Sequence, residues 1–411
     1  MAVPLRPDAC PGVFALHDAA DGALARVRLP GGAVDAAALR VVAGCAEELG
    51  DGAVHLTSRG NMQLRGLRRD DPRLARWLAA AGLLPSATHE RARNVLASPL
   101  SGIAGGLADV RHLAGELDRG LCARPALAEL SGRFLFALDD GRGDVAAEDP
   151  DLCWQAAGTS AGIMLVAGRP MAEVARAGAV TALLDAAEEF LARANGAWRT
   201  RPAAVGSAAA GPPTPAPVGG PGSRGAVRPT YSPADRPSDS DGPPVPAPPG
   251  QRAGDAATRA ATPQEGTPGD SAGHGGPPLG WVPGADALVC APVLGELSAA
   301  RLRVLAATAP DVIVTPWRTI VVPDARPGAD ARLAAAGFVV DPGSAVPLVS
   351  ACAGRPGCAK ALADVRADAR AALAAGRFTE RVHLSGCARR CGSPRGPHRA
   401  LVAHAEGQYT G

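Results

Sequence analysis

Four cysteines near the C-terminus have the spacing of ligands for an iron–sulfur cluster. Five residues separate Cys352 from Cys358, 28 residues follow, and three residues separate Cys387 from Cys391. Thiolates are soft ligands, and four of them can ligate the irons of a [4Fe–4S] cluster. Zinc is the alternative, although zinc pairs usually have about two to four residues between ligands and the first pair here is wider. The spacing therefore predicts a [4Fe–4S] cluster.

The composition argues against nucleic acid and membranes as partners. The chain has 42 Lys and Arg against 40 Asp and Glu, so a net charge of +2 creates no field that would attract a polyanion. No apolar run is long enough to span a bilayer, and the N-terminal residues lack the apolar core of a signal peptide. We therefore expect a cytoplasmic protein whose nine cysteines are ligands or core residues rather than disulfide partners.

One long segment divides the chain into two parts. Residues 201–280 are rich in Pro, Gly, Ala and Ser and show neither a helical nor a strand period. Such a composition buries too little apolar surface to offset the entropy lost on folding. We predict a disordered linker over 201–280.

The parts on either side of the linker share one order of elements. A strand, a helix and two further strands are expected at 24–29, 35–49, 53–57 and 62–67, and again at 287–291, 298–306, 311–315 and 319–322. Asp35 and Ser298 are the expected N-caps of the two helices. The turn between the last two strands holds Thr57 and Arg59 in one copy and Thr315 and Arg318 in the other. This order indicates an internal duplication, and the alternative is two ordinary β-α-β-β units.

Residues 84–200 read as a further α/β stretch. Strands are expected at 134–138 and 163–166, and helices at 171–177 and 180–194. The fold class expected for the whole chain is α+β.

Several motifs resemble the nitrite and sulfite reductase superfamily. They are the cysteine pattern, RVRLPGG at 26–32, TSRGNMQ at 57–63, RNVLASP at 93–99 and TPWR at 315–318. The resemblance implies two pseudo-twofold-related ferredoxin-like half-domains with α/β domains that bind a cluster and a tetrapyrrole. The expected parts are a first half-domain at 1–83, a tetrapyrrole-binding domain at 84–200, the linker at 201–280, a second half-domain at 281–345 and a cluster-binding segment at 346–411.

The resemblance also implies a groove that holds a tetrapyrrole bearing many carboxylates. A guanidinium group binds a carboxylate with two parallel hydrogen bonds and stays charged, so arginine suits this groove. The candidates for binding the macrocycle are Arg26, Arg28, Arg59, Asn61, Gln63, Arg65, Arg93 and Asn94, and the candidates for catalysis are Arg59, Arg93 and Arg133. Taken singly, each arginine has an alternative interpretation as a solvated surface charge.

Two enzyme families of this superfamily fit the motifs. The siroheme-dependent sulfite and nitrite reductases bind their anion with two arginines and two lysines, and the lysines lie one residue apart on a strand. The matching strand here has Arg133 and then Leu135, and the single lysine of the chain is Lys360. Ala-Arg-Arg separates Cys387 from Cys391, where the reductases usually carry Pro-Asn. These departures favour the second family, the precorrin-3B synthases.

The synthase resemblance implies a specific reaction. Precorrin-3A becomes precorrin-3B when a hydroxyl from O2 is installed at C20 and a ring A acetate closes a γ-lactone. The [4Fe–4S] cluster would pass on electrons from an NAD(P)H-linked or ferredoxin donor, and a mononuclear non-heme iron is a further candidate cofactor, with His383, His398 and His404 nearby. Siroheme is expected only under the reductase alternative. A non-catalytic tetrapyrrole-binding protein with a structural cluster is the third hypothesis.

Overall fold

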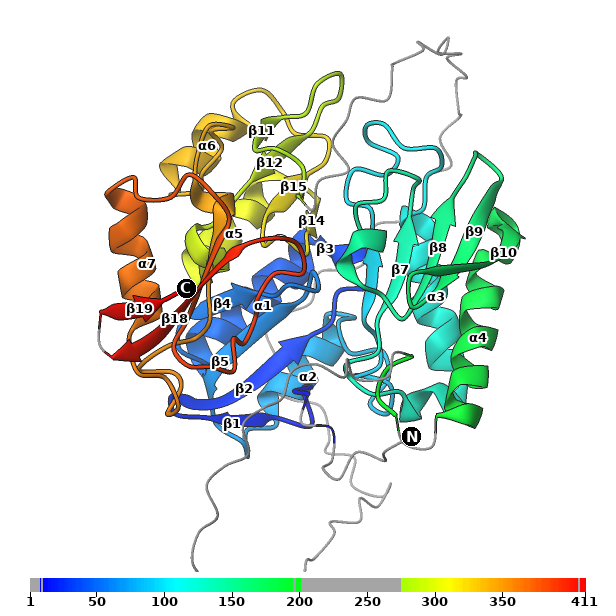
Figure 1. Cartoon of the computed structure of the whole chain (residues 1–411), viewed down its shortest axis with the longest axis horizontal. Coiled ribbons are helices and arrows are strands. Elements are labelled where there is room, and N and C mark those ends of the chain that lie inside the picture. Colours follow the sequence, from blue (N-terminus) through cyan, green and yellow to red (C-terminus); the bar gives the residue numbers. More distant parts are fainter. Residues whose placement is uncertain (1–7, 9, 195–196, 201–274, 406) are drawn as a thin grey trace, which may run out of the picture. The chain divides into compact units, whose positions relative to one another are not determined.

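The computed structural model describes residues 8, 10–194, 197–200, 275–405 and 407–411. Most of the predicted linker, residues 201–274, lies outside the described residues. The described elements form three five-stranded sheets and one four-stranded sheet (Figure 1). None of the helices in this part of the chain is long and apolar enough to cross a membrane. The fold is mixed α+β, which confirms the predicted class.

Two of the five-stranded sheets contain the two repeats. The first repeat supplies β1 (His17–Ala19), β2 (Gly22–Val27), β3 (Ala33–Asp35), β4 (Ala53–Leu56) and β5 (Met62–Leu67). The second supplies β11 (Gly280–Trp281), β12 (Leu288–Cys290), β13 (Glu296–Ser298), β14 (Asp311–Val314) and β15 (Ile320–Val322). The strand orders are β1-β2-β5-β4-β13 and β11-β12-β15-β14-β3.

Each repeat therefore gives one strand to the sheet of the other. β3 pairs with β14, and β13 pairs with β4, both antiparallel. Gly32 permits the first crossing, because its φ is 76° and a Cβ there would lie 2.0 Å from the carbonyl oxygen of Val314. The exchange is reciprocal, so the two repeats are related by a pseudo-twofold axis. This arrangement is the duplication that the sequence predicts.

Each repeat also contains two helices, α1 (Ala36–Leu49) and α2 (Arg73–Ala80) in the first, and α5 (Ala299–Thr308) and α6 (Ala329–Ala335) in the second. Asp35 accepts a hydrogen bond from the amide of Ala38 at 2.7 Å, and Ser298 accepts one from the amide of Arg301 at 3.3 Å. Both predicted N-caps are therefore confirmed. α1 and α5 pack against each other, and their apolar faces share one core.

The third five-stranded sheet belongs to the α/β region. Its strands are β6 (Val95–Ala97), β7 (Phe136–Asp139), β8 (Leu152–Ala156), β9 (Ala161–Val166) and β10 (Arg169–Ala175), in the order β10-β9-β8-β7-β6. The helices α3 (Arg111–Ala123) and α4 (Ala179–Arg193) pack beside it (Figure 1). Trp154, Phe134 and Phe136 are fully buried in its core.

One predicted element of this region is wrong. The sequence predicts a helix at 171–177, whereas these residues fall largely in β10, which pairs antiparallel with β9. Ala167 and Gly168 form the connecting turn with φ values of 50° and 75°. Because this turn returns the chain alongside β9, the backbone hydrogen bonds of the segment are made across the sheet rather than within a helix.

The four-stranded sheet carries the cysteine motif. Its strands are β16 (Val349–Ala351), β17 (Val382–Ser385), β18 (Arg399–Ala405) and β19 (Gln408–Thr410), with α7 (Val365–Ala374) against them. β16 and β17 are parallel, so their carboxyl ends lie at the same edge. Cys352 follows β16 directly, and Gly386 and Cys387 follow β17. The topology therefore brings the two cysteine pairs together.

Candidate functional site

The four cysteines of the motif face one another at the edge of this sheet. Burial raises the pKa of Cys391, and the thiol groups of Cys352, Cys387 and Cys358 raise it further. The amide of Gly386 donates a hydrogen bond to the Cys352 Sγ at 3.2 Å. Backbone N–H groups that point at sulfur are typical of iron–sulfur sites, where they tune the reduction potential.

The four cysteines match the ligand demand of a cubane cluster, in which each of the four irons takes one thiolate. Cys352, Cys358, Cys387 and Cys391 are therefore the residues that would hold a [4Fe–4S] cluster, which supplies one-electron transfer when bound.

Arg65 braces the loop of the first cysteine pair. Its guanidinium donates two hydrogen bonds of 2.8 Å to Asp21 and a third of 2.8 Å to the carbonyl oxygen of Gly357. The side chain is 6% exposed. The structure thus places Arg65, a candidate for tetrapyrrole binding, against the residue that precedes Cys358.

Arg318 braces the loop of the second pair. Its Nη2 donates to the carbonyl oxygen of Gly392 at 2.8 Å, directly after Cys391. Burial lowers the pKa of Arg318 to about 10, and the charge of Arg366 adds to this effect. Arg318 has a φ of 61°, a left-handed conformation that strains a residue with a side chain.

The hydrogen bonds of the two repeat turns correct one sequence correspondence. The amide of Thr57 donates to the carbonyl of Asn61 at 2.9 Å, and that of Thr315 donates to Thr319 at 3.0 Å. Counting from these bonds, Arg318 corresponds to Gly60, which also has a φ of 61°, and not to Arg59. Arginine thus occupies a backbone conformation that favours glycine. The hydrogen bond from Arg318 to the loop of the second cysteine pair is a reason for the arginine to be kept there.

This correspondence gives a first testable pair of variants. Arg318→Gly removes the bond to Gly392 and the backbone strain, whereas Arg318→Met removes the bond and keeps the strain. We expect both to release iron to a chelator several-fold faster than the wild type. The Met variant should also be less stable than the Gly variant by about 1–2 kcal/mol in denaturant titrations, because only glycine adopts this φ freely. Equal stability of the two variants would show that the turn is unstrained.

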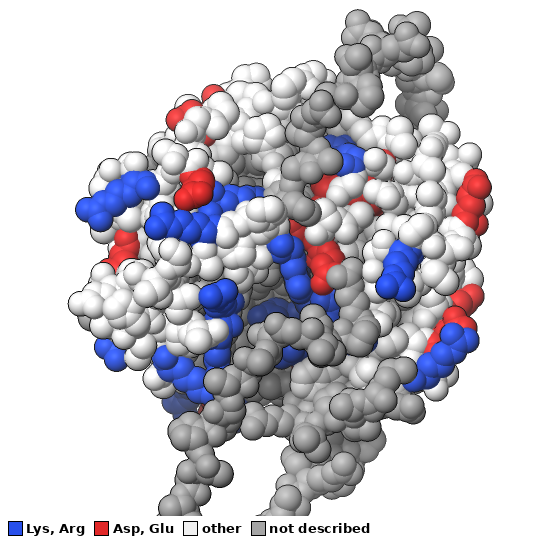
Figure 2. Space-filling view, viewed as in Figure 1, with Lys and Arg blue, Asp and Glu red and all other residues white. Residues whose placement is uncertain are grey.

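Three arginines of the first repeat form the centre of the predicted groove. Arg28 is 2% exposed, and the one side-chain hydrogen bond that it makes to a described residue goes from Nη2 to the carbonyl of Pro11 at 3.3 Å. Its Nε and Nη1, and the Nε of Arg26, are buried without a partner among the described residues. Burial holds the pKa of Arg28 well below its usual range, and the charges of Arg26 and Arg59 lower it further. Buried donors without acceptors favour an anionic ligand. Figure 2 shows Arg side chains around the hollow of this face.

Arg59 reaches from the repeat turn to the α/β region. Its Nη1 and Nη2 donate to the carbonyl oxygens of Gly132 and Arg133 at 3.1 and 2.9 Å. Burial lowers the pKa of Arg59 to about 10, and the charges of Arg199, Arg26 and Arg395 contribute. Arg199 and Arg395 lie near enough to Arg59 to act on its charge, but no sequence motif identified them. They are far from position 59 in the sequence, so their proximity arises only on folding.

Two polar candidates of the predicted groove, Asn61 and Asn94, link the first repeat to the α/β region. Asn61 accepts a hydrogen bond from the amide of Leu29 at 2.9 Å, and its Nδ2 lies 3.4 Å from the Oδ1 of Asn94. Asn94 in turn donates to the carbonyl of Gly132 at 3.0 Å. The Oε1 of Gln63 accepts a hydrogen bond from the Nη2 of Arg26 at 3.4 Å. Asn61 and Asn94 are thus buried links between the walls.

The three arginines predicted to be catalytic have different partners in the structure. Arg93 is 3% exposed and donates two hydrogen bonds to Asp118 at 2.7 and 2.8 Å. Arg133 lies over the ring of Trp198 at 4.8 Å from its centroid and is exposed. Arg59 donates a hydrogen bond to the backbone carbonyl of Arg133, and among the described residues it makes no hydrogen bond to the side chain of Arg93 or Arg133. Leu135 is 2% exposed and belongs to a small apolar core, so it does not face the groove.

The histidines near the cluster motif already have partners or are exposed. His383 is buried between the hydroxyl of Ser350 at 2.8 Å and the carbonyl of Cys391 at 3.2 Å. His398 lies 2.8 Å from both Ser393 and the carbonyl of Gly396. His404 is exposed. The rings of His383 and His398 lie 6.3 Å apart in an edge-on arrangement. Within the described residues, none of the three histidines belongs to a group of three or more close metal-ligating side chains.

An acidic loop follows β7 and gives a pH-dependent prediction. Burial raises the pKa of Asp144 to about 6, with Asp139 and Asp140 adding to the rise and the Ser98 hydroxyl opposing it. In the folded state the carboxyl therefore stays protonated up to a higher pH than in the unfolded chain. Stability falls as the pH rises from about 4 to about 6, because the folded state must release this proton.

Asp144→Asn should remove this dependence. The variant keeps an oxygen that accepts a hydrogen bond from Ser98 but carries no charge. We therefore expect its free energy of unfolding to exceed that of the wild type by up to about 3 kcal/mol at pH 8 and to equal it at pH 4. Urea unfolding at both pH values measures the difference. Asp70→Asn, at an exposed carboxylate, is the control and should change stability little at either pH.

Known proteins share both the first repeat and the wider fold. Residues 17–72 match the family model of the nitrite/sulfite reductase ferredoxin-like half domain, so the chain contains this half-domain. The chain is 32% identical over 165 residues to a precorrin-3B synthase of Sinorhizobium sp, and this match covers 39% of the chain and 35% of that protein. It is 33% identical to ferredoxin–nitrite reductases of Synechococcus elongatus, over 140 residues, and Leptolyngbya laminosa, over 138.

Each nitrite reductase match covers 27% of the relative, with 32% and 31% of this chain. The matches thus span about a third or less of these curated relatives. The structure of the NirA protein of Mycobacterium tuberculosis superposes with a TM-score of 0.55 and 20% identity over 89% of this chain and 68% of that one. The chain has the fold of that protein.

Proposed function

We propose that this protein is an iron–sulfur oxidoreductase of the precorrin-3B synthase type. In the proposed reaction, precorrin-3A, O2, two electrons and two protons give precorrin-3B and water. One oxygen atom enters as the C20 hydroxyl, the ring A acetate closes the γ-lactone, and the second oxygen atom leaves as water. An NAD(P)H-linked or ferredoxin donor would supply the electrons, and the four cysteines would hold a [4Fe–4S] cluster, which supplies one-electron transfer when bound.

The observation that carries this proposal is the set of buried, unsatisfied arginines. Arg28 and Arg26 have guanidinium nitrogens without partners among the described residues, and Arg59 lies beside them. Their charges repel one another, so a ligand with several carboxylates would relieve the repulsion and supply acceptors. The role of these residues in the reaction is to bind and orient the macrocycle, with Asn61 and Asn94 fixing the walls around it.

The strand beside the groove favours the synthase over a reductase. A reductase of this superfamily is expected to present a second cation two residues after Arg133, but Leu135 stands there and is buried in an apolar core. The only lysine, Lys360, is exposed in the segment that follows Cys358. A small anion such as sulfite or nitrite would therefore lack one of the cations that the reductases provide.

Turnover of precorrin-3A under labelled oxygen tests the proposal. Anaerobically purified protein is mixed with precorrin-3A and a chemical reductant, and then exposed to 18O2. We expect a product that carries one 18O atom, with the mass of the hydroxy-lactone. A protein that holds its cluster and a reductant yet leaves precorrin-3A unchanged would contradict the proposal.

Siroheme-dependent nitrite or sulfite reduction is the second candidate. It is supported by the two ferredoxin–nitrite reductases that match the chain at 33% identity. Here the four cysteines would hold the cluster and the arginines of the predicted groove would hold siroheme, which would supply the site of anion reduction. Visible absorption of siroheme in the purified protein, together with reductant-dependent consumption of nitrite or sulfite, would favour this candidate.

A further inference from the structure

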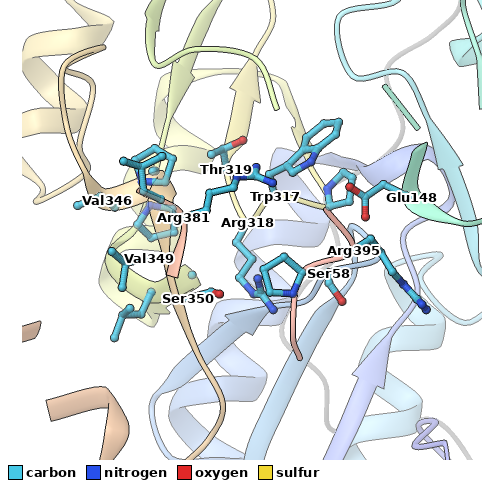
Figure 3. Close-up of a pocket in the computed structure, with 18 residues that line it drawn as sticks. Ser58, Glu148, Trp317, Arg318, Thr319, Val346, Val349, Ser350, Arg381 and Arg395 are labelled. Atoms are coloured by element: carbon cyan, nitrogen blue, oxygen red, sulfur yellow. The ribbon is translucent and has the colours of Figure 1, made fainter. Parts of the chain in front are cut away.

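A pocket beside the cluster loop is lined by cationic side chains that the candidate groove does not include. Its walls come from both repeats, the α/β region and the C-terminal sheet (Figure 3). Its polar lining residues include Arg318, Arg381, Arg395, Trp317 and Glu148. The lining includes three guanidinium groups and the carboxylate of Glu148, and Arg395 is also paired with Asp149, so the lining residues themselves carry net positive charge.

Arg381 has no partner of its own in this pocket. Its side chain makes no hydrogen bond or ion pair within the described residues, although the residue is partly buried. Burial lowers the pKa of Arg381, and the charge of Glu148 acts in the opposite direction. A guanidinium group that is partly desolvated and has no direct acceptor favours an anion.

Two further donors point to the same kind of ligand. The Nε1 of Trp317 is buried without an acceptor among the described residues. The indole packs against the small core that contains Leu135 and Val145, so its position is fixed. Arg318 uses one N–H for the carbonyl of Gly392 and lines the pocket with the rest of its side chain. Buried donors of this kind are normally satisfied by protein, water or ligand acceptors.

The pocket adjoins the arginine groove. Arg395 lines the pocket, pairs with Asp149 at 3.3 Å, and acts electrostatically on Arg59. Ser58, directly before Arg59, is also a lining residue. One large ligand can therefore reach both places, whereas a small anion would occupy only one.

We propose that this pocket binds one carboxylate arm of the tetrapyrrole held in the arginine groove, through Arg381, Arg318 and the indole N–H of Trp317. The inference rests on the proposed function, because it assigns a further contact of the same ligand. A carboxylate suits the donors, since its two oxygens accept a bidentate pair from a guanidinium and a further bond from an indole N–H. Trp317 and Arg318 come from the second repeat, and Arg381 comes from the C-terminal segment.

Binding of sirohydrochlorin, a fluorescent octacarboxylated tetrapyrrole, to the cluster-containing protein tests this assignment. Arg381→Gln should weaken binding about 10- to 100-fold, as expected when one partner of a desolvated charge pair is removed. Arg381→Lys should recover part of the loss, because lysine restores the charge without the bidentate geometry. Trp317→Phe should weaken binding about 3- to 10-fold, as expected from the loss of one hydrogen bond. Arg377→Gln, at an exposed arginine of the same segment, is the matched control and should bind as the wild type does.

The variants also separate this inference from the proposed function. If Arg59→Gln weakens binding and Arg381→Gln and Trp317→Phe do not, the pocket assignment is wrong and the groove stands. If the wild type does not bind sirohydrochlorin, the proposed function fails and this inference with it. If succinate binds in an Arg381-dependent manner without displacing sirohydrochlorin, the pocket serves a separate small acid, which also overturns the assignment. Iron content and thermal unfolding of each variant must match the wild type for the comparison.

Discussion

A Cys387→Ser variant is expected to lose the iron–sulfur cluster and, with it, much of the order of the C-terminal sheet. Wild-type protein purified without oxygen should contain about four irons per chain and absorb visible light as a [4Fe–4S] protein does. Serine cannot supply the thiolate that the fourth iron needs. The binding free energy of a metal site is also folding free energy, so the variant should unfold at lower denaturant concentration than the wild type.

The control for this variant is another cysteine outside the motif. Cys122 lies at the end of α3, is half-buried, and has its pKa raised by burial and by Asp118. Cys122→Ser should keep the full iron content and the absorption spectrum. Iron analysis and visible spectroscopy of both variants, prepared side by side, measure the effect. Full iron content in Cys387→Ser would exclude Cys387 as a ligand.

Local signals in the sequence predicted much of the fold. Asp35 and Ser298 cap their helices, as their positions before apolar periodic segments indicate, because capping depends on residues three positions apart. The exchange of β3 and β13 between sheets was not predicted, since strand pairing over long sequence separations leaves no local pattern. Residues 171–177 were assigned to a helix for the same reason, because only the pairing with β9 decides that they form a strand.

The candidate site was predictable to the extent that its residues form motifs. The four cysteines are adjacent in pairs, and the parallel strands β16 and β17 bring the pairs together. The partners of the arginines are tertiary: Asp21 binds Arg65 from 44 positions away, and Asp118 binds Arg93 from 25 positions away. A motif shows that an arginine is present. It does not show whether that arginine forms an ion pair with a carboxylate elsewhere in the chain.

The difference between an arginine that is paired with a carboxylate and one that is not leads to a second prediction, on stability. Arg93 and Arg28 are both buried, with exposures of 3% and 2%, but Arg93 is paired with Asp118, whereas Arg28 makes no ion pair with any described residue and interacts with Glu90 only at longer range. Removing one member of a buried pair leaves the other charge uncompensated, so Arg93→Met should destabilise the fold by about 3–5 kcal/mol. Arg28→Met removes a buried charge that Arg26 and Arg59 repel and that Glu90 offsets only in part, so we expect it to stabilise the ligand-free protein by about 1–4 kcal/mol.

Arg28→Met should have opposite effects on stability and on ligand binding. An anion bound in the groove satisfies Arg28, so Arg28→Met should lose about 2–5 kcal/mol of sirohydrochlorin binding while its unfolding midpoint rises. Urea titration of the ligand-free protein and fluorescence titration with sirohydrochlorin measure the two quantities on one preparation. Loss of both stability and binding would mean that Arg28 is a structural residue with a partner inside the folded chain. A rise in stability with a loss of binding would mean that the fold holds Arg28 at a cost that only its ligand offsets, which is the signature expected of a residue kept for binding rather than for folding.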